Sequence, residues 1–172
     1  MSGMERETEG TVVELARHRQ DRVFGKYRGI VQEVDSQGRL RAVVPAIGPD
    51  PLPWAVASSP FAGADHGLVL MPEVDDRVWI EFEGGDLSRP IWSGMAWKTD
   101  GLPVSSTAQR ALITPTGLTV MLDDDAGEIA LTHPGGAEIK LSDSEISLSI
   151  GAAEIKLSAS GVSINGTALE VR

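Results

Sequence analysis

The C-terminal part of the chain carries an internal repeat of sixteen residues. The letters AEIKLS occur at 137–142 and again at 153–158, and the apolar residues around them recur at the same spacing. Within each copy apolar and polar residues alternate, and glycines or Asp/Ser pairs separate the alternating stretches. Alternation with period two predicts short strands with one apolar face. Because a longer fixed period is typical of β-solenoids, the sequence predicts a β-helix over residues 113–172.

The predicted strands place one set of aliphatic side chains on a single face. This set comprises Leu118, Val120, Ile129, Leu131, Ile139, Leu141, Ile146, Leu148, Ile150, Ile155, Leu157, Val162 and Ile164. A sheet with one apolar face needs a second layer about 10 Å away, and the rest of the chain needs its apolar residues for its own core. We therefore expect three copies to cover one another around a common axis, as an intertwined trimeric β-helix or β-prism. A monomeric β-helix is the alternative interpretation.

Aromatic residues divide the chain into two parts. All tryptophan, tyrosine and phenylalanine residues lie at or before Trp97, and the following stretch KTDGLPVSST is rich in Gly, Pro, Ser and Thr. The sequence therefore predicts an N-terminal arm or short helix at 1–23, a domain at 24–97, a linker at 98–112 and the trimeric part at 113–172. The missing aromatics in the last part fit a narrow core shared around an axis.

Residues 24–97 are interpreted as short strands joined by turns. The stretches predicted as strands are KYRGIVQEV, RLRAVVP, WAVASS, HGLVLMP, DRVWIEFE and IWSGMAW. About five short strands in a segment of this length predict the five-stranded Greek-key barrel of the OB-fold. The expected fold class is all-β.

Composition narrows the classes of function. The net charge of -10 at pH 7 would repel a phosphate backbone, so no nucleic-acid partner is expected. The chain has no cysteine, which excludes disulfides and thiolate metal sites. The first ten residues lack the apolar segment of a secretory signal. The sequence contains no run of about 18 apolar residues, so it predicts no membrane span. We expect synthesis in the cytoplasm.

Residues with catalytic or metal-binding chemistry are scattered. The histidines His18, His66 and His133 lack the spacing of metal ligands. The run Asp123–Asp125 lacks the alternating ligands of an EF-hand loop and is interpreted as a solvated turn. No nucleophile elbow, P-loop or dinucleotide motif occurs. We expect no enzyme activity, no catalytic residue, no cofactor and no metal.

The segment LMPEVDDRVWIEFEGGDLSRPIWSGMAW, at 70–97, carries a more specific pattern. Its characteristic positions are Pro72, Asp76, Val78, Ile80, Phe82, Gly84, Gly85, Asp86, Pro90 and Gly94. The pattern resembles the signature of the baseplate spike family: phage baseplate assembly protein V and the OB domain of spike proteins of contractile tails, type VI secretion and extracellular contractile injection systems. The resemblance covers about residues 25–97, including the hairpin YRGIVQEVDSQGRLRAVVPAI. Asp75 departs from it, because the family usually has Gly at that position.

Physical chemistry gives the motif residues structural roles. Gly84 and Gly85 permit a tight turn. Asp86 can accept hydrogen bonds from the backbone of that turn, and Pro90 fixes the backbone at the start of the next strand.

The resemblance also implies a function. It implies a structural spike that is assembled at the baseplate of a phage-tail-like particle, in some cases released from the cell, attached to a hub protein through its OB domain, and driven through the target envelope. Some relatives end in an iron-binding H-x-H needle, which this chain lacks, so we expect a separate PAAR-type tip protein at the C-terminal end. The residues alone leave two alternatives open: an OB-fold nucleic-acid or ligand-binding protein, and a β-solenoid enzyme that acts on glycans.

Overall fold

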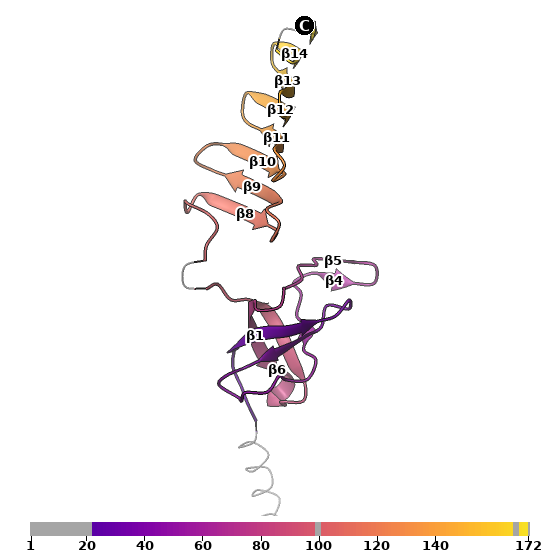
Figure 1. The fold of residues 1–172 in the computed structure, drawn as a ribbon, viewed down its shortest axis with the longest axis vertical. Coiled ribbons are helices and arrows are strands. Elements are labelled where there is room, and N and C mark those ends of the chain that lie inside the picture. Colours follow the sequence, from indigo (N-terminus) through magenta and orange to yellow (C-terminus); the bar gives the residue numbers. More distant parts are fainter. Residues whose placement is uncertain (1–21, 99–100, 167–168, 172) are drawn as a thin grey trace, which may run out of the picture. The chain divides into compact units, whose positions relative to one another are not determined.

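A computed structural model describes residues 22–98, 101–166 and 169–171. The chain divides into two compact units, residues 1–100 and 101–172. Apart from one 3-10 turn, η1 (Glu83–Gly85), the described elements are strands (Figure 1), which confirms the all-β class. Among these residues no helix has the length and apolar character needed to cross a membrane. The predicted N-terminal arm or short helix falls outside the described residues except for its last two.

The first unit is built on a curled five-stranded sheet. Its strands are β1 (Tyr27–Val34), β2 (Leu40–Val43), β3 (Val56–Ala57), β6 (Arg77–Phe82) and β7 (Pro90–Met95). Their order is β2-β1-β6-β7-β3, and all neighbours are antiparallel except β3 and β7. Two bridges, Leu40 to Ala55 and Val43 to Pro51, join β2 to the segment that leads into β3 and so close the sheet. This is the OB-type barrel that the sequence predicts.

Period-two alternation explains which side chains fill the barrel. The buried apolar residues are Val31, Leu40, Ala42, Val44, Leu52, Ala55, Val78, Ile80, Phe82 and Trp92. The indole Nε1 of Trp92 donates a hydrogen bond to the carbonyl of Gly38 at 2.9 Å, so the polar atom of this large side chain is satisfied. Gly29 lies where β1 crosses the core, and a Cβ there would come within 3.0 Å of Ile80 Cγ1 and 3.2 Å of Ala42 Cβ.

A short hairpin extends from the barrel between β3 and β6. It consists of β4 (Ala62–Gly63) and β5 (His66–Gly67), which pair only with each other. The sequence predicts a longer strand over HGLVLMP, but the described strand ends at Gly67. Beyond it, the N–H of Leu68 donates one hydrogen bond to the carbonyl of Phe61 at 2.8 Å. Residues 69–71 belong to none of the described strands, and the side chains of 68–71 are exposed.

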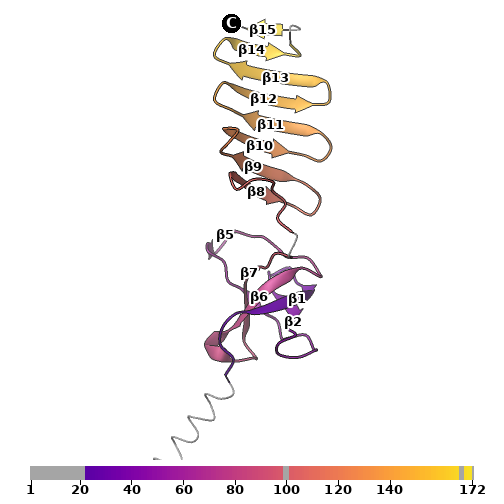
Figure 2. The same ribbon diagram turned by 90° about the vertical axis from the view of Figure 1, so that its left-hand side faces the viewer.

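The second unit is a single sheet of eight short strands. They are β8 (Gln109–Ile113), β9 (Thr119–Asp123), β10 (Glu128–Thr132), β11 (Ala137–Leu141), β12 (Glu145–Ile150), β13 (Ala153–Ser158), β14 (Gly161–Ile164) and β15 (Leu169–Val171). Each strand pairs antiparallel with the next in the chain, so the sheet is a meander, which Figure 2 shows as a ladder.

The described part of one chain does not show the coils of a β-helix that the repeat predicted. Sixteen residues instead make one hairpin: the two copies of AEIKLS lie in β11 and β13, and β12 returns between them. Residues 151–152 connect β12 to β13. Parallel neighbours need a crossover of about a dozen residues, so a connection this short forces the antiparallel arrangement.

The boundary between the units differs from the predicted linker in one respect. Strand β8 begins at Gln109, inside the stretch 98–112 that the sequence assigns to a linker. On the side of β8 that carries Leu112, the position two residues earlier is occupied by Arg110 instead of an aliphatic residue. The alternation is therefore too weak to reveal this strand from sequence.

Candidate interaction surface

The register of the second unit stacks its aliphatic side chains in columns. Leu131 pairs with Ile139, Ile139 with Leu148, and Leu148 with Ile155. A second column beside the first contains Leu122, Ile129, Leu141, Ile146, Leu157 and Val162. Directly paired residues of an antiparallel sheet point to the same side, so both columns lie on one surface. We call this surface the apolar face.

Every residue predicted for the trimer core lies on the apolar face. Val120 and Ile164 extend the first column. Leu118 and Ile150 lie beside it on the same face, two residues along the chain from Val120 and Leu148. The apolar face also includes Leu112, paired with Val120, which the sequence interpretation missed because it placed this residue in the linker.

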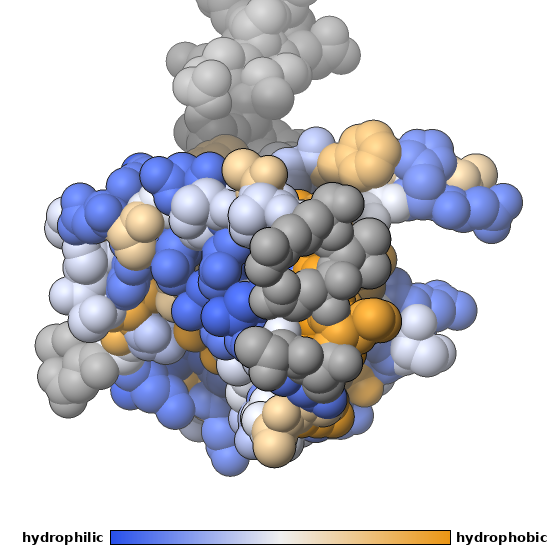
Figure 3. Space-filling model, turned by 90° about the horizontal axis from the view of Figure 1, so that it is seen from above, coloured by the Kyte–Doolittle hydropathy of each residue, from blue (hydrophilic) through white to orange (hydrophobic). Residues whose placement is uncertain are grey.

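The apolar face has no cover within the described residues of its own unit. Leu148 is 44 % exposed and Ile150 63 %. None of the residues 101–166 is buried, so as a single layer this unit has no core. In the view from above, hydrophobic residues lie beside hydrophilic ones on the surface of the molecule (Figure 3). The side chains of the first column line a groove of about 740 Å³, and His133 and Asn165 are also among its lining residues.

The opposite face of the ladder carries two matching charge clusters. Lys140 Nζ lies 3.5 Å from Glu128 Oε2 and 3.7 Å from Glu138 Oε1. In the next repeat, Lys156 Nζ lies 3.8 Å from Glu145 Oε1 and 3.3 Å from Glu154 Oε1. Such partly exposed pairs stabilise a fold by at most about 1 kcal/mol each. Their main consequence is that only the other face of the sheet is suited to burial.

The aspartate run closes the turn between β9 and β10. Asp123 accepts hydrogen bonds from the Gln109 side chain at 2.8 Å and from the backbone N–H groups of Ala126 and Asp125 at 3.0 and 3.1 Å. The Gln109 hydrogen bond, followed by that from Ala126, lowers the pKa of the Asp123 carboxyl. Asp124 forms an ion pair with Arg110. The Asp123 and Asp124 carboxylates therefore form their contacts inside this turn and with the neighbouring strand β8.

The described histidines are held by local backbone contacts. Nδ1 of His133 accepts a hydrogen bond from the N–H of Gly135 at 2.9 Å, and Nδ1 of His66 lies 2.8 Å from the carbonyl oxygen of Ala64. His18 falls outside the described residues. In the described part of the chain, no group of three His, Cys, Asp or Glu side chains could hold a metal ion.

The motif of the first unit surrounds two turns of the barrel. Val78, Ile80 and Phe82 point inward from β6, and Pro72 and Pro90 are buried. Gly94 lies in β7, where the register to β6 shifts.

The paired glycines form the turn between β6 and β7. Gly84 and Gly85 have φ of 59° and 80°, which glycine adopts without strain. Asp86 Oδ1 accepts hydrogen bonds from the hydroxyl of Ser88 at 2.7 Å and from its N–H at 2.9 Å. These two bonds, the hydroxyl's first, lower the pKa of the Asp86 carboxyl. The geometry therefore gives Asp86 hydrogen bonds that hold this turn.

The turn before β6 explains the departure from the motif. Asp75 has a φ of 70°, in the left-handed region where glycine is the ordinary choice and aspartate is tolerated. The N–H of Glu73 donates to Asp76 Oδ2 at 2.8 Å and closes this turn. The backbone conformation is thus one that suits the glycine found in the family pattern, although another residue occupies it.

Comparison with protein families gave two matches that follow the two units. Residues 27–97 match the type VI secretion system/phage-baseplate injector OB domain. Residues 110–170 match the phage baseplate V C-terminal trimerisation domain. The second match begins close to Gln109, where β8 starts. Comparison with curated proteins gave no significant match.

Proposed function

We propose that this chain, which belongs to the baseplate spike family of phage tails and injection systems, is the central spike of a contractile tail-like particle. Both matched domains are structural ones, and together they cover most of the chain. The protein is therefore a structural baseplate or spike component, and its C-terminal unit is a trimerisation domain. The particular role of central spike is the step that we add.

The uncovered apolar face carries the proposal. The aliphatic columns of this sheet stay exposed in one chain, and its other face carries paired charges. Such a sheet needs a second apolar layer to cover its columns. Three such sheets around an axis bring their columns together and leave the lysine and glutamate clusters in water. Each aliphatic side chain that becomes fully buried contributes about 1.5–3 kcal/mol relative to full exposure, and the partly exposed ones here gain a fraction of that. Summed over the columns of three chains, this supports a stiff prism.

We further propose that the two units have different roles in the spike. The OB barrel attaches to the baseplate hub, and the ladder points away from the hub and meets the target envelope. The support is the family match of the barrel to an injector OB domain together with exposed apolar side chains of the barrel such as Phe24 and Leu87.

We also propose a separate tip protein at the C-terminal end. Strand β15 is the last strand of the sheet order, so one of its edges has no partner within the described ladder. An open edge next to exposed Leu169 is an adhesive surface. A small cone-shaped protein of the PAAR type would cover three such edges at once, and any metal at the point would belong to it.

The test uses the intact protein and its genetic neighbours. Light scattering after size exclusion should give three times the 18.3 kDa of one chain. Co-expression with neighbouring hub and tip candidates, followed by pull-down, should recover both partners. A monomer at micromolar concentration would contradict the trimeric prism, whereas a trimer that recovers neither partner would contradict the central-spike role.

A further inference from the structure

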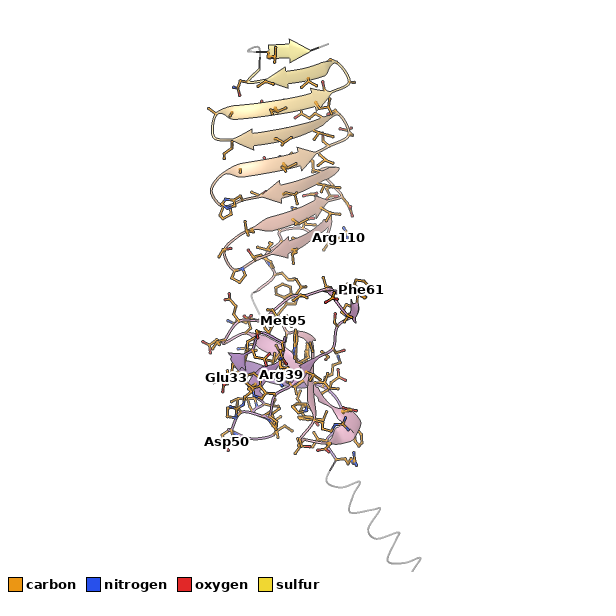
Figure 4. The ribbon with its side chains drawn as sticks, turned by 90° about the vertical axis from the view of Figure 1, so that its right-hand side faces the viewer. Glu33, Arg39, Asp50, Phe61, Met95 and Arg110 are labelled. Atoms are coloured by element: carbon orange, nitrogen blue, oxygen red, sulfur yellow. The ribbon has the colours of Figure 1, made fainter. Side chains whose placement is uncertain are left out.

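The hairpin arm of the barrel is the most exposed apolar segment of the first unit. We define the arm as residues 58–71, which include β4 and β5. Phe61 is 60 % exposed and Val69 73 %, and Leu68, Leu70 and Met71 are exposed as well. No residue of the arm is buried. Figure 4 shows Phe61 on the arm, away from the side chains that fill the barrel.

The composition of the arm indicates what kind of partner covers it. Between Ser58 and Met71 the only carboxylate is Asp65, at the tip, and there is no lysine or arginine. Obligate contacts between identical subunits are more apolar than transient contacts between different proteins. An arm with five large exposed apolar side chains and a single carboxylate therefore suits a second copy of this chain better than a partner that binds and leaves.

A shallow cleft on the barrel has the complementary character. It has a volume of about 510 Å³ and is lined by β1 and β6 together with Pro45 and Ala46. Across the two strands, Arg28 pairs with Trp79 and Ile30 with Arg77, and the guanidinium of Arg28 lies 5.3 Å from the centre of the Trp79 ring. Tryptophan and arginine are the residues most enriched at the centres of protein interfaces.

Charge distinguishes this cleft from the rest of an acidic protein. Of its three cations, Lys26 is paired with Glu81 at 2.9 Å. Within the described residues, Arg28 and Arg77 form no ion pair, and neither does Asp65 at the tip of the arm. One carboxylate on an apolar arm thus matches two guanidinium groups around an apolar cleft.

We propose that the arm of each protomer docks in the Trp79 cleft of the next protomer, with Asp65 against Arg28 and Arg77. The contact is head-to-tail, and three copies close it into a ring. It rests on the proposed homotrimer, whose C-terminal domains hold the barrels together. Residues 99–108 span at most about 35 Å when extended, so the tethered barrels meet at a high effective concentration. Docking in this ring covers Phe61 and residues 68–71.

Engineered cysteines test the contact directly, because the chain has none of its own. Ala64→Cys at the arm tip and Ile30→Cys in the cleft are combined in the full-length protein. Mild oxidation should then give covalent dimers and trimers on a non-reducing gel. The matched control combines Ala64→Cys with Gln37→Cys, which lies in the turn at the other end of β1 and should give no such bands.

A charge reversal adds an independent measurement in the same cross-linked background. Asp65→Arg should lower the yield of cross-linked species by about two- to five-fold, the change expected from one exposed ion pair. Adding Arg77→Asp should restore it. Equal yields in all three proteins would overturn the assigned pairing of charges.

The outcomes separate this inference from the proposed function. A particle of trimer mass by light scattering that gives no cross-link between Ala64→Cys and Ile30→Cys overturns the docking and leaves the trimer standing; the arm then covers another partner such as the hub. A monomer overturns both. Cross-linked trimers in the test pair and none in the control pair support the docking.

Discussion

Leu148 and Ser147 are neighbours whose replacement by the same residue should have opposite outcomes. Leu148 lies on the apolar face between Ile139 and Ile155. Ser147 lies on the other face between Lys140 and Lys156. Leu148→Asp should abolish the trimer, and Ser147→Asp should leave it intact.

The magnitudes follow from these surroundings. Leu148 is 44 % exposed in one chain, so Leu148→Asp removes only a fraction of about 1.5–3 kcal/mol of apolar burial from each chain. A carboxylate confined among aliphatic side chains costs several kcal/mol more. Three chains share the core, so the assembly loses on the order of 10 kcal/mol, or about seven powers of ten in its association constant. Ser147→Asp instead places a carboxylate directly opposite two lysines, and cross-strand pairs of opposite charge are favourable by about 0.2–1 kcal/mol.

Light scattering after size exclusion measures the mass of each variant at several concentrations. Leu148→Asn, which keeps the shape of Asp without the charge, should weaken the trimer less. Burial raises the pKa of a carboxyl group, so the Leu148→Asp trimer should partly recover at pH 4–5. Equal masses for Leu148→Asp and Ser147→Asp would show that the assigned faces, or the trimer interface itself, are wrong.

Three further predictions concern stability. Gly29→Val should lower the free energy of unfolding of the barrel by several kcal/mol, because its side chain would overlap Ile80 and overpacked cores are strained; calorimetry measures it, and an unchanged transition would refute the close approach. Asp75→Gly should raise the melting temperature of the barrel slightly, since glycine adopts the positive φ more readily than aspartate, whereas Asp75→Val should lower it. The pKa of Asp86 and of Asp123 is lowered in the folded chain, so each carboxylate stabilises its turn above the ordinary carboxyl pKa of about 4, and this stabilisation is lost as pH falls through the lower folded value; acid titration followed by circular dichroism should lose this sensitivity in Asp86→Ala and Asp123→Ala.

Alternation of apolar and polar residues predicted the faces of the strands well, because a strand that is buried on one side needs apolar residues at every second position. Val78, Ile80 and Phe82 alternate in the sequence and are all buried in the barrel. The apolar residues of the ladder alternate too, and their register places them on one face. The arm could not be predicted in the same way. The apolar residues 68–71 predict a strand, yet in the structure they lie outside the described strands.

The repeat shows where periodicity alone is insufficient. A period of sixteen residues fits one coil of a solenoid and also fits two strands with their turns, and only the connections decide between them. Here the two residues 151–152 are enough for a hairpin turn between β12 and β13 but too few for the crossover that parallel strands need. The choice matters for assembly, because a meander forms all its backbone hydrogen bonds between neighbours in sequence. Each chain can therefore complete its own sheet from local contacts, and what remains for association is the burial of a finished apolar face. We expect a trimer built in this way to be a prism of three sheets in which the aliphatic columns hold the chains together.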